Sequence, residues 1–308
     1  MEGRNMAVVA IDCGGTNLSA ALVERATDRS TPVTVATPAD AADIPATIAD
    51  VAAGLGGGFS AVGVSIAGLI RDGDLVWMPH RDAGTPIAAP VSAALGVPVA
   101  VDNDANVAGL AEATAGAGRG HRMVLMVTIG TGIGGGLVVD GRIEHGRGFL
   151  GEIGHVIVDP GGPRCSCGNF GCWEALASGT ALDRAARALA ADDPTSMVAS
   201  LAGASVPSGR HLVEAASAGD GPAGAAFEEF AVHFGRGLAN MVVVFDPDVI
   251  VVGGGVGAMG EPLLEPARAA LNESLSGRRH RLETPVVAAT FGTRAGIVGA
   301  ALLAGAPV

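Results

Sequence analysis

Two residue types are missing from this sequence: its 308 residues include no lysine and no tyrosine, so all 19 basic residues are arginine. A Walker-type P-loop and a protein kinase each use a lysine to bind phosphate, and Schiff-base enzymes need a side-chain amine. The sequence therefore excludes these three mechanisms. Any phosphate-binding site must be built from backbone N–H groups, hydroxyls, arginine and a divalent metal ion.

Long apolar runs and a positive net charge are also lacking. No uninterrupted apolar run reaches the roughly 18 residues of a membrane span, and residues 1–10 do not have the regions of a signal peptide. We therefore expect a cytoplasmic protein with no membrane partner. The formal charge of −12 repels polyanions, which argues against nucleic acid as a partner and favours a small neutral substrate.

Glycine, in contrast, is abundant and concentrates in two similar segments. Residues 8–23 and 124–139 each have the pattern of a strand, a tight turn with glycines, and a second strand. Glycine permits positive φ angles and close backbone approach, so each turn can present N–H groups to an anion. Each turn alone could be an ordinary hairpin, but the pair predicts a site for one polyphosphate. The turn residues are Asp12, Gly14, Gly15, Thr16 and Asn17 in the first segment, and Thr131 and Gly132 in the second.

The rest of the chain alternates between short apolar runs and alanine-rich helical patterns, which predicts an α/β protein with two domains. We expect a small N-terminal domain at 1–106, with the last helix at 294–308 packing back on it. A larger domain would occupy 107–293. Expected strands lie at 61–66, 97–101 and 249–252, and expected helices at 44–55, 105–115, 181–190, 223–244 and after 296. After the strand at 249–252, Gly254 and Gly255 could bring bare backbone against an adenine ring or could form an ordinary turn.

Residues 101–106, Val-Asp-Asn-Asp-Ala-Asn, follow a strand and open a helix. Asp102 or Asp104 could simply cap that helix. In a phosphoryl-transfer enzyme without lysine or tyrosine, however, a carboxylate must accept the proton of the substrate hydroxyl. Asp104 is the predicted base.

Three of the four cysteines lie within eight residues, close to a histidine. A Cys-x-Cys pair with a third thiol and a histidine supplies the four ligands of a closed structural zinc site, while reduced buried cysteines are the alternative. The predicted ligands are His155, Cys165, Cys167 and Cys172. Zinc would tie the segment of Glu152 to that of Glu174, so that both carboxylates reach one ligand. We expect the other histidines, His145 among them, at the surface or in satisfied core positions.

These motifs, in this order, resemble the ROK sugar kinases (repressor, open reading frame, kinase), and within that family the bacterial ATP-dependent glucokinases. The resemblance covers almost the entire chain. It rests on Asp12-x-Gly14-Gly15-Thr16-Asn17, Asn103-Asp104-Ala105-Asn106, Thr131-Gly132-Ile133-Gly134-Gly135-Gly136, Glu152-Ile153-Gly154-His155, Cys165-Ser166-Cys167-Gly168 with Gly171-Cys172-Trp173-Glu174, Phe245-Asp246-Pro247 and Gly253-Gly254-Gly255. The resemblance implies the two-domain actin-like ATPase fold (ribonuclease H-like, sugar kinase type), with a zinc-binding insertion in the larger domain and a homodimer or homotetramer.

The resemblance also implies a role for each matching residue. Asp104 is the catalytic base, and the expected sugar-binding residues are Gly68, Asn103, Asp104, Glu152, His155 and Glu174. Mg²⁺ and ATP would meet Asp12, Gly14, Gly15, Thr16, Asn17, Thr131 and Gly132, and the nucleoside would meet Gly254 and Gly255. His155, Cys165, Cys167 and Cys172 would hold structural Zn²⁺.

The expected reaction is transfer of the ATP γ-phosphoryl group to the primary hydroxyl of a hexose, most simply glucose to glucose 6-phosphate. A kinase for another sugar or a C7-cyclitol, and a catalytically idle sugar-binding sensor, are the alternatives. Trp77-Met78-Pro79-His80-Arg81 stands where many family members have Pro-Asn, which leaves the acceptor open. Family repressors carry a helix-turn-helix segment before the first strand, and none fits here, so we expect no DNA binding.

Overall fold

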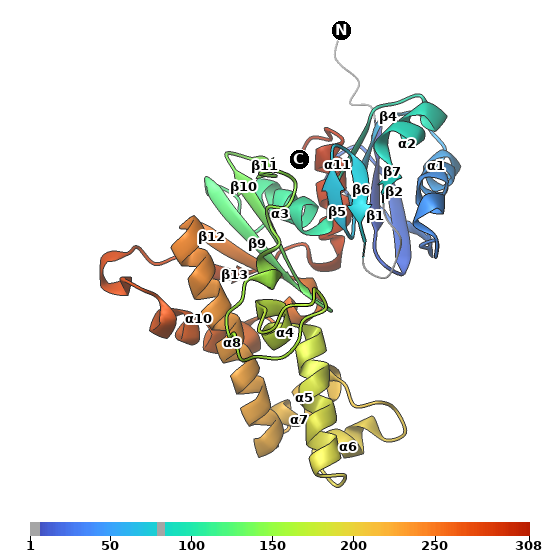
Figure 1. Cartoon of the computed structure of the whole chain (residues 1–308). Coiled ribbons are helices and arrows are strands. Elements are labelled where there is room, and N and C mark those ends of the chain that lie inside the picture. The colour runs from blue at the N-terminus through green and yellow to red at the C-terminus, as the bar shows by residue number, and fades with distance from the viewer. Residues whose placement is uncertain (1–6, 79–83) are drawn as a thin grey trace. The chain divides into compact units, whose positions relative to one another are not determined.

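A computed structural model describes residues 7–78 and 84–308 (Figure 1). By their internal contacts the residues form two compact units. The first comprises Met1–Met126, Gly136–Gly151 and Thr290–Val308, and the second comprises Val127–Gly135 and Glu152–Ala289. This division places residues 107–126 and 136–151 with the N-terminal unit, whereas the sequence pattern assigned them to the larger domain. As limits of independently folding domains, 1–106 and 107–293 stay a prediction.

The first unit contains a five-stranded sheet with the strand order β3-β2-β1-β4-β8. β1 pairs antiparallel with β2 and parallel with β4, and β4 pairs parallel with β8. The strands are β1 (Ala7–Cys13), β2 (Asn17–Val23), β3 (Val33–Ala36), β4 (Phe59–Ile66) and β8 (Val99–Asn103). The predicted hairpin and the two predicted strands are therefore present. The carboxyl ends of the parallel strands β1, β4 and β8 lie at one edge of this sheet, where such folds bind ligands.

Both faces of this sheet are buried, because alternate residues of β1 enter different cores. Val9 and Ile11 pack in one core with α1 and α2, while Val8 and Ala10 pack in the other with α3 and α11. α11 lies so close to the sheet that a Cβ atom at Gly63 would overlap the backbone of α11. The helices are α1 (Ile44–Gly54), α2 (Ala88–Leu95), α3 (Asp104–Ala115) and α11 (Ala295–Leu303).

Smaller elements complete the first unit. A three-stranded sheet has the order β5-β6-β7, and β10 pairs antiparallel with β11. The strands are β5 (Leu69–Arg71), β6 (Asp74–Trp77), β7 (Thr85–Pro86) and β11 (Arg142–Glu144). The hairpin of β9 (Met123–Ile129) and β10 (Ile133–Val139) carries the chain into the second unit and back. The sequence patterns did not indicate β3, the small sheet or β11, which are short strands with little apolar periodicity.

The second unit is mainly helical around the parallel pair of β12 (Val249–Gly253) and β13 (Val286–Ala288). Its long helix α8 packs along α10 (Figure 1). Trp173 of α4 stacks on Phe234 of α8 with ring centroids 5.5 Å apart. Its helices are α4 (Trp173–Ala177), α5 (Gly179–Asp192), α6 (Met197–Ala202), α7 (Gly209–Ser217), α8 (Gly221–Phe245), α9 (Gly254–Gly257) and α10 (Glu261–Ser274). Single 3-10 turns lie at Ala41–Asp43 and Gly292–Arg294 in the first unit, and at Ile153–His155 and Arg278–His280 in the second. Within the described ranges, no helix combines the length and the apolar character that crossing a membrane requires.

Candidate active site

The predicted base lies at the junction of β8 and α3. Asn103 is the cap of α3: its side-chain oxygen accepts hydrogen bonds from the backbone N–H groups of Ala105 and Asn106, at 2.9 and 3.2 Å. The Asn103 amide also donates to the carbonyl oxygen of Gly68 at 2.9 Å. The cap is thus neither of the two aspartates that the sequence suggested. Because Asn103 satisfies the start of the helix, the Asp104 carboxylate, which itself accepts one bond from Ala105, is not needed for that role.

The chemical environment of Asp104 suits a proton acceptor. Burial, reinforced by the nearby Asp12 carboxylate, raises the pKa of Asp104 from 3.8 to about 6. Asp104 is exposed to solvent, although many protein atoms lie around its carboxylate. Water therefore screens part of the rise in its pKa. A carboxylate with a pKa near 6 is mostly ionised at neutral pH and is a better proton acceptor than an ordinary aspartate.

The first glycine turn places Asp12 beside two elements of the first unit. Its carboxylate accepts a hydrogen bond from Ser65 of β4 at 2.9 Å, and a Cβ atom at Gly296 of α11 would overlap it. Burial raises the pKa of Asp12, and the bond from Ser65 partly opposes this. Gly15, Thr16 and Asn17 are exposed at the tip of the turn. A partly buried carboxylate beside an exposed glycine turn fits a hydrated Mg²⁺ and phosphate oxygens.

The second glycine turn, in the second unit, is held from behind by other backbone segments. Gly179 donates its N–H to the Gly130 carbonyl at 2.8 Å, and the Thr180 hydroxyl donates to the Thr131 carbonyl at 2.7 Å. Gly254, with φ +83°, lies so close to Ile129 that a Cβ atom would overlap its backbone. Three glycine segments are predicted to bind nucleotide. Two of them, at 130–132 and 254–255, therefore lie together at the ends of β9 and β12.

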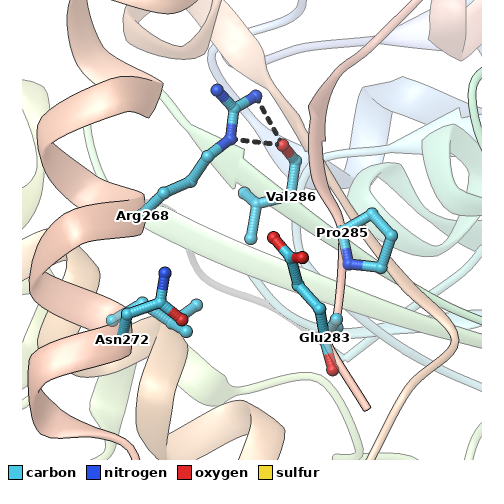
Figure 2. A pocket seen from close by; sticks show the side chains of 7 residues that line it. Arg268, Asn272, Glu283, Pro285 and Val286 are labelled. Carbon is cyan, nitrogen blue, oxygen red and sulfur yellow. Dashed lines mark hydrogen bonds between the residues drawn. The ribbon is translucent and has the colours of Figure 1, made fainter.

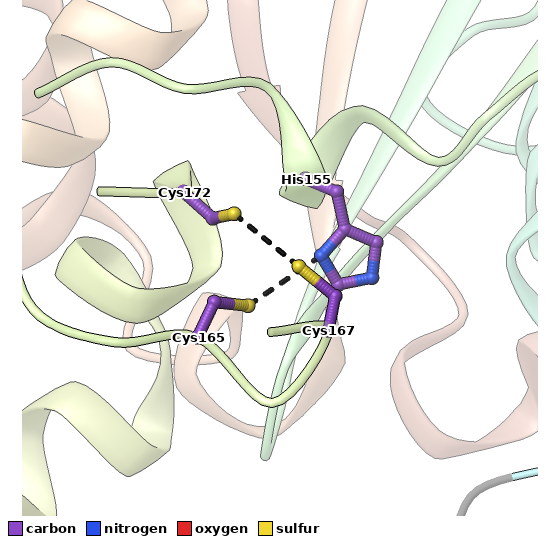
Figure 3. A group of neighbouring side chains, drawn as sticks. All are labelled: His155, Cys165, Cys167 and Cys172. Carbon is purple, nitrogen blue, oxygen red and sulfur yellow. Dashed lines mark hydrogen bonds between the residues drawn. The ribbon is translucent and has the colours of Figure 1, made fainter. Parts of the chain in front are cut away.

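The four predicted zinc ligands converge in the second unit, as Figure 3 shows. One ligand atom from each residue lies within 4.8 Å of the others. The Cys165 sulfur is 3.6 Å from His155 Nδ1, and the sulfur atoms of Cys167 and Cys172 are also 3.6 Å apart. Three thiols and one imidazole nitrogen at such separations fit a tetrahedral structural zinc ion.

The two carboxylates predicted to bind sugar flank this cluster. His155 turns Nδ1 toward the cysteines, and its Nε2 lies 3.7 Å from Glu152 Oε2, so the Glu152 carboxylate lies beside the outer nitrogen of the ring. Burial, with a smaller contribution from Glu174, raises the pKa of Glu152, whereas His155 lowers it. Glu174 accepts hydrogen bonds from the backbone N–H of Ile133 at 3.0 Å and from the Ser166 hydroxyl at 3.3 Å. Glu174 therefore joins the cysteine loop to the second glycine turn, a contact that the sequence did not indicate.

Three further polar residues support the site of the first unit. Ser65 lies in the apolar strand β4 and donates to Asp12; its lone hydroxyl in an apolar run is the sequence signal for this role. Thr37 donates its hydroxyl to the Gly14 carbonyl at 2.8 Å and supports the first turn. His145 was expected at the surface or in the core; its ring is half-exposed, but its Nε2 lies 2.6 Å from the buried Asp102.

The acceptor loop is described only in part. Met78 is buried and Trp77 is half-exposed, whereas Pro79, His80 and Arg81 lie outside the described residues. The bearing of this segment on the choice of acceptor therefore stays a prediction.

Two surface pockets lie away from the predicted site. One, of about 180 Å³, is lined by Arg268, Asn272, Glu283 and Val286 and their neighbours (Figure 2). Arg268 is fully engaged there, because it donates to the Val286 carbonyl and to the Glu261 carboxylate. A second, of about 560 Å³, lies between α1, α2 and β7 and has mostly alanine and proline walls. Neither pocket contains a residue of the predicted site.

Comparison with known proteins agrees with the geometry. The ROK family matches residues 8–306. A glucokinase of Streptomyces coelicolor is 37% identical over 309 residues, covering 97% of this chain and 98% of the relative. An N-acetylmannosamine kinase of Salmonella typhimurium is 34% identical over 308 residues, covering 97% and 98%.

The fold agrees as well. The crystal structure of a ROK family glucokinase from Streptomyces griseus in complex with glucose and AMPPNP is 39% identical and has a TM-score of 0.85, covering 97% of this chain and 99% of that one. The predicted fold class, the two-domain actin-like ATPase fold of the sugar kinases, is thereby confirmed. Matched along almost its full length by sequence and by structure, this chain belongs to the ROK family.

Proposed function

We propose that this protein transfers the γ-phosphoryl group of ATP to the primary hydroxyl of a hexose, and that glucose is the preferred acceptor. The observation that carries the proposal is the position of Asp104 at the end of β8, with a pKa raised to about 6 and with its helix capped by a neighbour. The glucokinase relatives support glucose as the acceptor.

In the proposed mechanism Asp104 accepts the proton of the sugar hydroxyl as its oxygen attacks the γ-phosphorus in line with the leaving ADP oxygen. The new P–O bond forms as the bond to ADP breaks, and the proton remains on the carboxyl group until product leaves. General bases contribute about 10²-fold or more to such a step. The amide of Asn103, whose nitrogen donates to the Gly68 carbonyl, would orient the same hydroxyl.

The remaining sugar hydroxyls are assigned to the carboxylates at the cysteine cluster. Glu152 is partly exposed, and its carboxylate lies 3.7 Å from His155 Nε2, beyond hydrogen-bond distance, so it retains the capacity to accept hydrogen bonds from a sugar. Glu174 already accepts bonds from Ile133, from Ser166 and from the Cys165 thiol, and its remaining acceptor capacity would serve the ligand. A pocket built of such acceptors favours a neutral polyhydroxylated ring and disfavours an anionic sugar.

ATP would bind through the glycine turns. The exposed residues Thr16 and Thr131 would contact the phosphates, and the exposed Gly254 and Gly255 would offer a side-chain-free surface to the nucleoside. Mg²⁺, when bound near Asp12, would neutralise phosphate charge during transfer. No lysine takes part, in agreement with the composition of the chain.

The test is a direct assay of ADP release by the purified protein with glucose, mannose, N-acetylmannosamine, N-acetylglucosamine, fructose, allose and a C7-cyclitol. The proposal expects sugar-dependent ADP release, highest in kcat/KM for glucose. If another acceptor exceeds glucose by more than about tenfold, equivalent to roughly 1.4 kcal/mol of transition-state preference, the glucose assignment is wrong while the kinase mechanism stands. Glucose binding in calorimetry without ADP release from any acceptor would instead identify a sensor.

Two further assignments accompany the function. Since ATP is supplied inside the cell, we propose the cytoplasm as the place of action. Assembly as a homodimer or homotetramer, expected from the family resemblance, can be measured by light scattering coupled to size-exclusion chromatography.

A further inference from the structure

A buried carboxylate lies directly beside the proposed base. Asp102, the residue before Asn103 in β8, is 4% exposed. Its Oδ1 accepts hydrogen bonds from the backbone N–H of Asn103 at 2.7 Å and from the side-chain amide of Asn106 at 2.9 Å. Both donors belong to the segment that carries Asp104. This carboxylate therefore fixes the turn from β8 into α3 from its buried side.

The other oxygen of Asp102 is held by a distant part of the chain. His145 Nε2 lies 2.6 Å from Asp102 Oδ2, although the two residues are 43 positions apart. The His145 side chain is 51% exposed, so only its inner nitrogen enters the buried network. A charge-assisted bond of this length is among the stronger hydrogen bonds in proteins.

His145 also organises its own segment, residues 145–151, which we name the connector. Its carbonyl oxygen accepts hydrogen bonds from Gly148 at 2.7 Å and from Leu150 at 3.4 Å, which closes the connector into a compact turn. Gly148, with φ +97°, lies against the side chain of Arg71 in β5. The connector ends at Gly151, directly before Glu152 in the chain. One residue thus contacts the base segment through its ring and shapes the connector through its backbone.

We propose that His145 is a positioning residue of the kinase: its bond to Asp102 fixes the Asn103–Asp104 segment and anchors the connector that leads to Glu152. The inference rests on the proposed function, because it assigns His145 to the same sugar site. His145 has no role in proton transfer in this scheme and contacts no reacting atom. It acts through Asp102. Without the imidazole, Asp102 Oδ2 would bond to water instead of to the protein.

The size of the effect follows from the geometry required for transfer. Misplacement of a catalytic group by about 1 Å can cost about 10²-fold in rate. Removing the imidazole leaves Asp102 with its two bonds to Asn103 and Asn106, so the segment should loosen rather than unfold. We therefore expect a loss of about tenfold to a hundredfold in kcat/KM for the sugar. It should appear as a higher KM for sugar together with a lower kcat, while KM for ATP changes less than about threefold.

The experiment compares three single variants in the full-length protein. His145→Ala removes the bond, and His145→Gln returns an amide nitrogen near the position of Nε2. Arg147→Ala changes an exposed side chain of the same connector and is the matched control. The acceptor is whichever sugar the wild type phosphorylates best, and circular dichroism confirms that each variant is folded.

We expect the alanine variant to lose activity as stated, the glutamine variant to recover to within about fivefold of wild type, and the arginine control to remain within about twofold. Alanine activity within about twofold of wild type would overturn the proposal. A glutamine variant no better than alanine would also overturn it, because ring packing rather than the bond would then be responsible.

A second measurement does not require catalysis. Hydrogen exchange followed by NMR or mass spectrometry reports the protection of the Asn103 and Asn106 backbone amides. The proposal expects exchange there to accelerate about tenfold or more in His145→Ala but not in Arg147→Ala. Unchanged protection would refute it. A wild-type protein that phosphorylates no sugar would defeat the proposed function, while the exchange result would still decide whether His145 holds this segment.

Discussion

The raised pKa of Asp104 makes a quantitative prediction for the pH dependence of turnover. With a pKa of about 6, about nine tenths of the carboxyl groups are ionised at pH 7 and about one tenth at pH 5. Since only the ionised form accepts a proton, kcat/KM for the sugar should fall about tenfold between these pH values, with a limiting slope of one. An aspartate at the ordinary pKa of 3.8 would lose less than about a tenth of its activity over that range.

The titration of Asp104 can be separated experimentally from the titration of ATP. Burial and the negative charge of Asp12 both disfavour the ionised form, so the base is lost as pH falls through about 6 and is fully available above it. The terminal phosphate of ATP also titrates near neutrality. Measuring kcat/KM for sugar at saturating Mg·ATP removes that contribution, because the nucleotide is then already bound.

The assay should detect ADP directly, so that coupling enzymes do not impose their own pH profile. Asp104→Asn is the companion variant: it preserves size and hydrogen-bonding shape but cannot accept the proton. We expect it to reduce kcat by about 10²-fold or more while glucose affinity stays within an order of magnitude. A midpoint below about pH 5 in the wild type would refute the pKa reasoning. An asparagine variant that keeps more than about a tenth of the wild-type rate would remove Asp104 from the role of base.

Three other predictions concern stability. The protein should contain one zinc ion per chain, and Cys165→Ser should lose it and lower the melting temperature together with sugar affinity; elemental analysis that finds no zinc in the wild type would contradict this. Glu112→Gln should cost about 1–3 kcal/mol in urea unfolding, because both oxygens of this buried carboxylate accept backbone N–H groups, whereas the exposed Glu144→Gln should be nearly neutral. Gly63→Ala should destabilise by about 1–3 kcal/mol or more, because its Cβ atom would overlap α11, while Gly54→Ala, with open space, should not; equal effects would show that the packing argument fails.

The features that were predictable from sequence are those fixed by local pattern. The hairpin of β1 and β2 follows from two apolar runs around a glycine turn, and the four zinc ligands follow from cysteine spacing and one nearby histidine. Both require knowledge of only a short stretch of chain. The family resemblance extended this to the fold, because the order of the motifs is itself specific.

Long-range contacts were not predictable in the same way. The bond between Asp102 and His145 joins residues 43 positions apart, and that between Glu112 and Phe291 joins residues 179 apart. No periodicity relates such pairs, since each depends on how strands and helices are stacked. The prediction that Asp102 or Asp104 could cap α3 was wrong for a related reason. Aspartate and asparagine are both good caps, and only the backbone direction at the end of β8 selects Asn103.

The cysteine cluster shows why a structural metal ion belongs at this position. Between Glu152 and Cys172 the chain has one 3-10 turn and two isolated bridges, and the hydrophobic cluster around the cysteines is small, with Cys165, Cys172 and Ala175 as its buried residues. So little apolar burial cannot offset the entropy of ordering about twenty residues. Zinc binding supplies that free energy through four ligands. Because His155 reaches Glu152 and the cysteine loop reaches Glu174, the ion that orders the segment also orients both carboxylates, which explains why stability and sugar affinity should fall together when it is removed.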